Sequence, residues 1–108
     1  MVDFKLTEEQ MMIRDMAREF CEAEVAPHAE EWDRSGTYPR DAITKAHELG
    51  LLNVTIPEKY GGAGMSTVDE MIICEELSRG DPGFGTASYH TMLASFPILT
   101  GGTEAQKA

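Results

Sequence analysis

Residues 56–66, IPEKYGGAGMS, place three glycines directly before a helical pattern, an arrangement that proteins use to bind phosphates. A dinucleotide-binding loop requires G-x-G-x-x-G after a strand. Gly62-Ala63-Gly64 supplies the first half of that pattern, but Thr67 stands where the third glycine is needed. A Walker A loop requires Gly-Lys-Ser/Thr, whereas Met65 follows the last glycine. We therefore interpret this stretch as a tight turn that permits close packing, rather than as a nucleotide site.

The other residue types that could do chemistry form no recognisable catalytic or metal-binding set. The three histidines are His28, His47 and His90, and their spacing is not that of metal ligands, so no metal site is predicted. The first two are expected at the surface or its boundary. His90 lies in an uncharged segment and is interpreted either as a core residue or as one that lines a cavity. The adjacent acids Glu30/Glu31 and Glu75/Glu76 diverge on a helix, which is typical of a solvated face.

The net charge of -10 disfavours nucleic acid and anionic membrane surfaces as partners, because both attract clustered Lys and Arg. Cys21 and Cys74 lie far apart in apolar helical runs, so we expect buried free thiols, as in a reducing compartment. The N-terminus resembles neither a signal peptide nor a transit peptide, and no membrane insertion is expected. These features favour a cytoplasmic protein, with the mitochondrial matrix after removal of a transit peptide as the alternative.

Helix start and stop signals run along the whole chain. Residues 51–56 form a brief extended run, but it is too short to found a sheet, so the sequence predicts an all-α fold. Gly50 and Gly80 are expected just past the ends of the second and third helices. Helices are expected to begin after Thr7, at Pro39 as first helical residue, after Ser66 or Thr67, and at Pro82, with a kink or break near Ala26 caused by Pro27.

Residues 82–103 contain no Asp, Glu, Lys or Arg, which is unusual in so acidic a chain. Prolines, glycines and hydroxyl groups interrupt the segment, so it is not a membrane span. We interpret it as a helix that is buried on most sides or lines a cavity, and we expect Pro97 to bend or end it. Its hydroxyl groups either bond back to helix carbonyls or face an elongated apolar ligand.

Thr103 and Gln106 form a capping-box pattern two residues before the end of the sequence. A helix start with so little helix behind it is expected of a chain that has been cut short. Residues 1–108 are expected to form one domain.

Five stretches resemble the N-terminal domain of the acyl-CoA dehydrogenases, in the order and spacing of that family. The resemblance covers essentially the whole chain, and its specificity comes from the five stretches occurring together. They are LTEEQ at 6–10, EVAPHAEEWDRSGTYP at 24–39, LGLLNVTIPEKYGGAGMS at 49–66, CEELSRGDPG at 74–83 and GTEAQK at 102–107.

The resemblance implies an up-and-down helical bundle that precedes a middle β domain and a C-terminal helical domain. It implies an FAD-dependent enzyme that dehydrogenates acyl-CoA thioesters at the α,β position, usually as a homotetramer, and passes electrons to an electron-transferring flavoprotein. The flavin-binding segments and the catalytic glutamate belong to the later domains, so this domain alone is expected to be inactive. Alternatives are an acyl-CoA oxidase or enoyl-CoA reductase of the same superfamily, or a helical binding module without activity.

In the family, the N-terminal domain mainly forms a wall of the acyl-chain cavity. By position, the helix after Asp81-Pro82 supplies that wall in this chain. Tyr89 is bulky and is hypothesised to shorten or shape the pocket. The resemblance assigns the acyl-facing role to Gly85, Thr86, Tyr89, His90 and Leu93.

Overall fold

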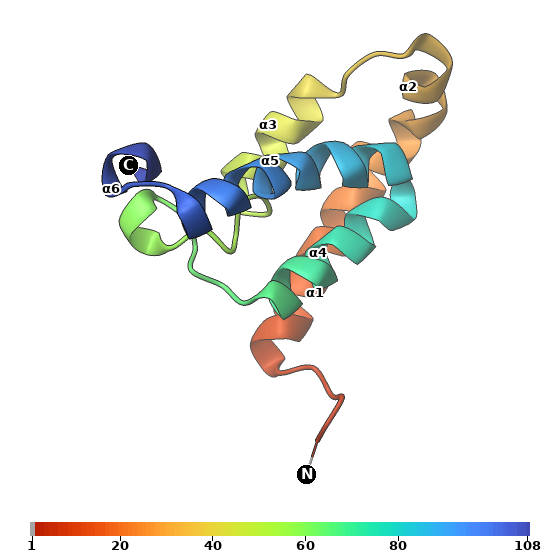
Figure 1. Cartoon of the computed structure of the whole chain (residues 1–108). Helices are drawn as coiled ribbons and strands as arrows, with labels where there is room; N and C mark the ends of the chain where they lie inside the picture. Colours follow the sequence, from red (N-terminus) through yellow and green to blue (C-terminus); the bar gives the residue numbers. More distant parts are fainter. Residues whose placement is uncertain (1) are drawn as a thin grey trace.

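The computed structural model describes residues 2–108, and these form helices, turns and loops with no strand (Figure 1). The predicted all-α fold is confirmed. In chain order the elements are α1 (Glu8–Phe20), a π-helical turn (Cys21–Val25), a 3-10 turn (Ala26–His28), α2 (Ala29–Ser35), α3 (Arg40–Glu48), a 3-10 turn (Glu58–Tyr60), α4 (Thr67–Gly80), α5 (Pro82–Gly101) and α6 (Glu104–Lys107).

Local hydrogen bonds fix the helix starts. The Thr7 side chain accepts a hydrogen bond from the Gln10 amide, and the Gln10 side chain accepts one from the Thr7 amide, so a capping box forms at the helix start expected after Thr7. Ser66, and not Thr67, caps α4 in the same way with Asp69. Each box satisfies amides that the first helical turn would otherwise leave unpaired.

The expected break near Ala26 is confirmed. After α1 the chain passes through the π-helical and 3-10 turns, and Pro27 lies in the latter, where its missing N–H prevents a regular α-helix. Two boundaries differ from the sequence prediction. Pro39 precedes α3 as its N-cap, and Gly80 is the last residue of α4. The helix α5 continues past Pro97 to Gly101, so the alternative that the proline ends the helix is wrong.

The core lies where α4 packs between α1 and α5. Ile73 and Leu77 on α4 are buried there. Phe84 on α5 is fully buried and stacks on Trp32 with ring centroids 5.9 Å apart. The centroid of its ring also lies 6.2 Å from that of the Phe20 ring. Such aromatic pairs contribute roughly 0.5–1.5 kcal/mol each beyond their buried area. This cluster joins the start of α5 to the end of α1.

The run at residues 51–56 is not extended, which corrects the sequence prediction. It forms turns, and Asn53 has a left-handed φ of 56°. Leu51 and Val54 are buried, at 3% and 1% exposure. Burying both residues on the same side requires the chain to turn between them, because the side chains of an extended strand alternate in direction.

The glycine-rich stretch is the predicted tight corner. The amides of Gly62 and Gly64 donate to the carbonyls of Pro57 and Ile56, at 3.2 and 2.9 Å. A Cβ on Gly62 would lie 2.0 Å from the Ile56 carbonyl oxygen, so only glycine fits there. Since both amides already have backbone partners, the loop offers no free cradle for a phosphate.

Within residues 2–108, no helix combines the length and the apolar character needed to cross a membrane.

Candidate functional site

The long uncharged helix α5 begins on a side-chain cap. The Asp81 carboxylate accepts hydrogen bonds from the amides of Gly83 and Phe84, at 3.0 and 3.1 Å, and Pro82 is the first helical residue. This confirms the predicted start signal. The cap fixes where each later residue of α5 points.

One face of α5 packs on the domain's own core. Gly85, Ser88 and Met92 are buried along it. Gly85 is a packing glycine, because a Cβ there would lie 2.0 Å from the Ser78 hydroxyl oxygen on α4. The opposite face is open. Leu93 and Phe96 are 56% and 60% exposed, so the expectation that α5 is buried on most sides is wrong for these residues.

The five residues assigned to the acyl tail therefore separate into groups. Thr86, His90 and Leu93 are exposed on the open face, and Gly85 faces α4. His90 is not a core histidine, which settles one of its two interpretations. Tyr89 is half-buried at the border between the two faces. The predicted acyl-facing role of all five residues remains a prediction.

The hydroxyl groups of α5 mostly bond to backbone carbonyls one turn earlier, which is one of the two interpretations that the sequence left open. Thr86 donates to the Pro82 carbonyl at 2.9 Å, Ser88 to that of Gly85 at 2.9 Å, and Ser95 to that of Thr91 at 2.7 Å. Thr91 also donates to the Asn53 side-chain oxygen at 2.8 Å. That bond ties the middle of α5 to the turns at residues 51–56.

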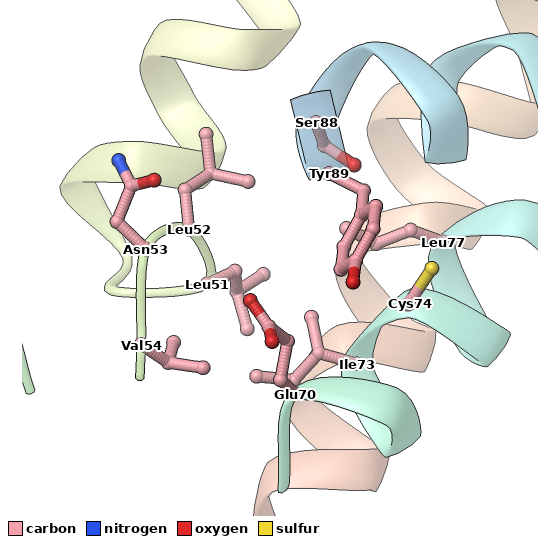
Figure 2. Close-up of a pocket in the computed structure, with 10 residues that line it drawn as sticks. All are labelled: Leu51, Leu52, Asn53, Val54, Glu70, Ile73, Cys74, Leu77, Ser88 and Tyr89. Carbon is pink, nitrogen blue, oxygen red and sulfur yellow. The ribbon is translucent and has the colours of Figure 1, made fainter. Parts of the chain in front are cut away.

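A small cavity lies between α4, α5 and residues 51–54 (Figure 2). Its volume is about 20 Å³, enough for roughly one water molecule. The Tyr89 side chain points from α5 into this space, toward α4. Its lining is mostly apolar, with a carboxyl, an amide, a thiol and hydroxyl groups. The lining residues are Leu51, Leu52, Asn53, Val54, Glu70, Ile73, Cys74, Leu77, Ser88 and Tyr89.

The sequence analysis missed the carboxyl group in this cavity. This group belongs to Glu70, which is 9% exposed. Burial raises the pKa of Glu70, and a hydrogen bond with the Thr55 side chain lowers it to a smaller extent. The available signal was helical phase, since Glu70 shares a face with Ile73 and Leu77 at i, i+3 and i+7.

Glu76 is a second buried acid and corrects the prediction of a solvated Glu75/Glu76 pair. It is 6% exposed, while Glu75 is exposed as expected. Arg18 on α1 binds both Glu76 carboxylate oxygens, at 2.7 and 3.0 Å. Arg79 lies 3.5 Å away and adds a second cation. The charge of Glu76 is therefore balanced by two arginines, and its role is structural. Among the described residues, Glu70 forms no such ion pair.

The two thiols differ in environment. Cys21 is buried as predicted and approaches the Leu77 carbonyl at 3.6 Å, whereas Cys74 is only half-buried. Burial raises the pKa of Cys21. Neither cysteine forms a disulfide within residues 2–108, and no cluster of His, Cys, Asp and Glu there has the geometry of a metal site.

Together, the fold and the site define an all-helical domain whose long uncharged helix has one face on its own core and an apolar face left open. The chain belongs to the acyl-CoA dehydrogenase family, since the family model described as acyl-CoA dehydrogenase, N-terminal domain, matches residues 7–108. The resemblance inferred from the five sequence stretches is thereby confirmed.

Individual relatives agree with this assignment. The chain is 40% identical over 108 residues to the probable acyl-CoA dehydrogenase YngJ of Bacillus subtilis (strain 168), a match that covers 98% of this chain and 28% of that protein. The glutaryl-coenzyme A dehydrogenase in its glutaryl-CoA complex superposes with a TM-score of 0.91 at 34% identity, covering 98% of this chain and 28% of the other. An acyl-CoA dehydrogenase from Bacillus anthracis, complexed with FAD, superposes with a TM-score of 0.79 at 33% identity, covering 99% of this chain and 18% of the other.

Proposed function

We propose that this chain serves as the N-terminal domain of an FAD-dependent acyl-CoA dehydrogenase and that α5 walls the acyl-chain pocket. The open face of α5 carries this proposal. Leu93 and Phe96 are more than half exposed, and the helix has no charged residue from Pro82 to Gly101. An uncharged, mostly apolar face with a few hydroxyl groups suits an acyl chain, and exposed apolar patches commonly mark binding surfaces.

The proposed reaction is α,β-dehydrogenation of an acyl-CoA thioester with FAD as cofactor. No residue of this chain is assigned to the flavin or to the catalytic base. The glycine corner does not fit a flavin phosphate, because its amides at Gly62 and Gly64 are bonded to Pro57 and Ile56. The chain spans only 28% of the Bacillus subtilis relative, and the proposal assigns the flavin and the base to parts of the protein outside these residues.

The quaternary structure and partners are proposed from the family resemblance. We propose a homotetramer that passes electrons to an electron-transferring flavoprotein, and a cytoplasmic location. The 108-residue chain by itself is expected to bind no flavin and to show no activity.

The test is a substrate panel on the purified protein that carries this domain, with dye or flavoprotein as electron acceptor. A flavin spectrum and acceptor reduction by saturated acyl-CoA thioesters would support the proposal. Peroxide formation in air would favour an acyl-CoA oxidase instead, and reduction of enoyl-CoA in the reverse direction alone would favour a reductase. A colourless, inactive protein would favour a helical binding module.

A further inference from the structure

The small cavity between α4, α5 and residues 51–54 contains an acidic residue with no positively charged partner in the described part of the chain. Glu70 is 9% exposed and lies among apolar side chains of α4 and of residues 51–54 (Figure 2). No Lys, Arg or His lines this cavity. Within residues 2–108 the Glu70 carboxylate belongs to none of the ion pairs, which distinguishes it from Glu76 on the same helix. A buried carboxylate in such a place projects its charge with little screening.

Tyr89 connects this acid to the proposed acyl pocket. Its side chain lines the same cavity as Glu70, and its backbone lies on α5, whose open face carries Leu93. An acyl end that reaches Tyr89 therefore comes close to the Glu70 carboxyl. The nearby part of α5 offers no compensation, because it has no Lys or Arg from Pro82 to Gly101.

We propose that Glu70 is a specificity-determining residue that excludes acyl groups ending in a carboxylate, so that the substrate is an acyl-CoA with an uncharged acyl group. This inference rests on the proposed function and narrows its substrate class. A second carboxylate near Glu70 would either meet repulsion in a poorly solvated site or force one of the two acids to take up a proton. An uncharged acyl end of the same length meets neither cost.

Access to the cavity is limited by its size. A cavity of about 20 Å³ holds one water molecule but not an acyl chain. The acyl end therefore does not enter the cavity, and the Glu70 carboxylate repels a charged acyl end from the other side of the Tyr89 ring. The discrimination is therefore electrostatic and should change with the charge of residue 70 more than with its size.

The test compares two acyl-CoA thioesters of equal chain length, hexanoyl-CoA and its ω-carboxyl analogue adipoyl-CoA, on the whole flavin-loaded protein at mildly alkaline pH. The measured quantity is the ratio of the two kcat/KM values. The variant is Glu70→Gln, which removes the charge and keeps the shape. Glu75→Gln is the matched control, because it removes the same charge from the exposed side of the same helix.

The wild-type protein is expected to favour hexanoyl-CoA strongly. Glu70→Gln should narrow the ratio about tenfold by improving the relative use of adipoyl-CoA, and Glu75→Gln should leave the ratio within about twofold. If Glu70→Gln does not load flavin, Glu70→Leu carries the same expectation. Equal use of both thioesters by the wild-type protein, or an unchanged ratio in the residue-70 variant, would overturn the inference while the proposed function stands. No turnover of any acyl-CoA would overturn both.

Discussion

The Arg18 guanidinium on α1 donates two hydrogen bonds, of 2.7 and 3.0 Å, to the Glu76 carboxylate on α4. The acid side chain is 8% exposed and the arginine 44%, so the pair is shielded on the carboxylate side only. It joins residues 58 apart in the sequence and fixes α1 against the central helix. The pair therefore stabilises the packing of α1 against α4, the helix that α5 packs on.

Glu76→Gln is expected to lower the free energy of unfolding by about 1–3 kcal/mol near neutral pH. This range is below the usual cost of breaking a fully buried pair, because water screens the exposed arginine. Chemical denaturation of the variant and the wild-type protein measures the difference. Glu75→Gln, an exposed change on the same helix, should alter stability by less than about 0.5 kcal/mol.

The same pair predicts acid sensitivity. The hydrogen bond from Arg18, aided by the charges of Arg18 and Arg79, holds the pKa of Glu76 below its ordinary value of 4.5. A lowered pKa means that the folded state binds this proton less readily than the unfolded state. The stabilisation is thus present above about pH 4.5 and is lost as pH falls through the folded-state pKa. The stability gap between wild type and Glu76→Gln should close over that acidic range, and a pH-independent gap would contradict this.

Glu70, on the same helix, is expected to change the pH dependence of stability in the opposite direction. Burial raises its pKa above the ordinary 4.5, so its ionisation disfavours the folded state as pH rises from the unfolded-state pKa to the folded-state pKa. Glu70→Gln is expected to raise the melting temperature near neutral pH, with a gain that shrinks below about pH 4.5. Thermal unfolding monitored by circular dichroism checks this. A variant that melts earlier than wild type at neutral pH would show that the charge is well solvated.

Features set by neighbouring residues were predictable from the sequence, and those set by distant contacts were not. The caps at Thr7 and Asp81 use bonds to amides two or three residues away, and both predictions hold. Glu76 is buried beside Arg18, which is 58 residues away in the sequence, and the Asn53 side chain accepts a hydrogen bond from Thr91 on α5. No local pattern encodes either contact. Glu70 is an intermediate case, since its helical phase indicated burial but its acidic type argued against it.

Gly85→Ala is expected to destabilise the protein by about 1–3 kcal/mol. Its Cβ would lie 2.0 Å from the Ser78 hydroxyl oxygen and 2.9 Å from the Ser78 Cβ, so α4 and α5 would have to separate. Gly101→Ala is the matched control in the same helix, because a Cβ there meets nothing within 4 Å. That change should be neutral or slightly stabilising, since alanine favours helix over glycine. Equal stability of the two variants would show that α4 and α5 are loosely packed.

Tyr89→Ala is expected to extend the acyl-chain preference of the whole flavin-loaded protein toward longer chains. The Tyr89 ring fills space beside the small cavity and the open face of α5, so removing it deepens the proposed pocket. Each additional buried CH₂ contributes about 0.8 kcal/mol, and two of them correspond to a rise of roughly tenfold in relative kcat/KM for the longer substrate. Tyr38→Ala is the control, because Tyr38 is 53% exposed and lies near the start of α5, beside Gly83 and Phe84, and not at the cavity that Tyr89 lines. The measurement is kcat/KM across a series of straight-chain acyl-CoA thioesters. An unchanged preference in the residue-89 variant would remove Tyr89 from the acyl pocket, whereas a shift in both variants would point to a general loosening of the domain.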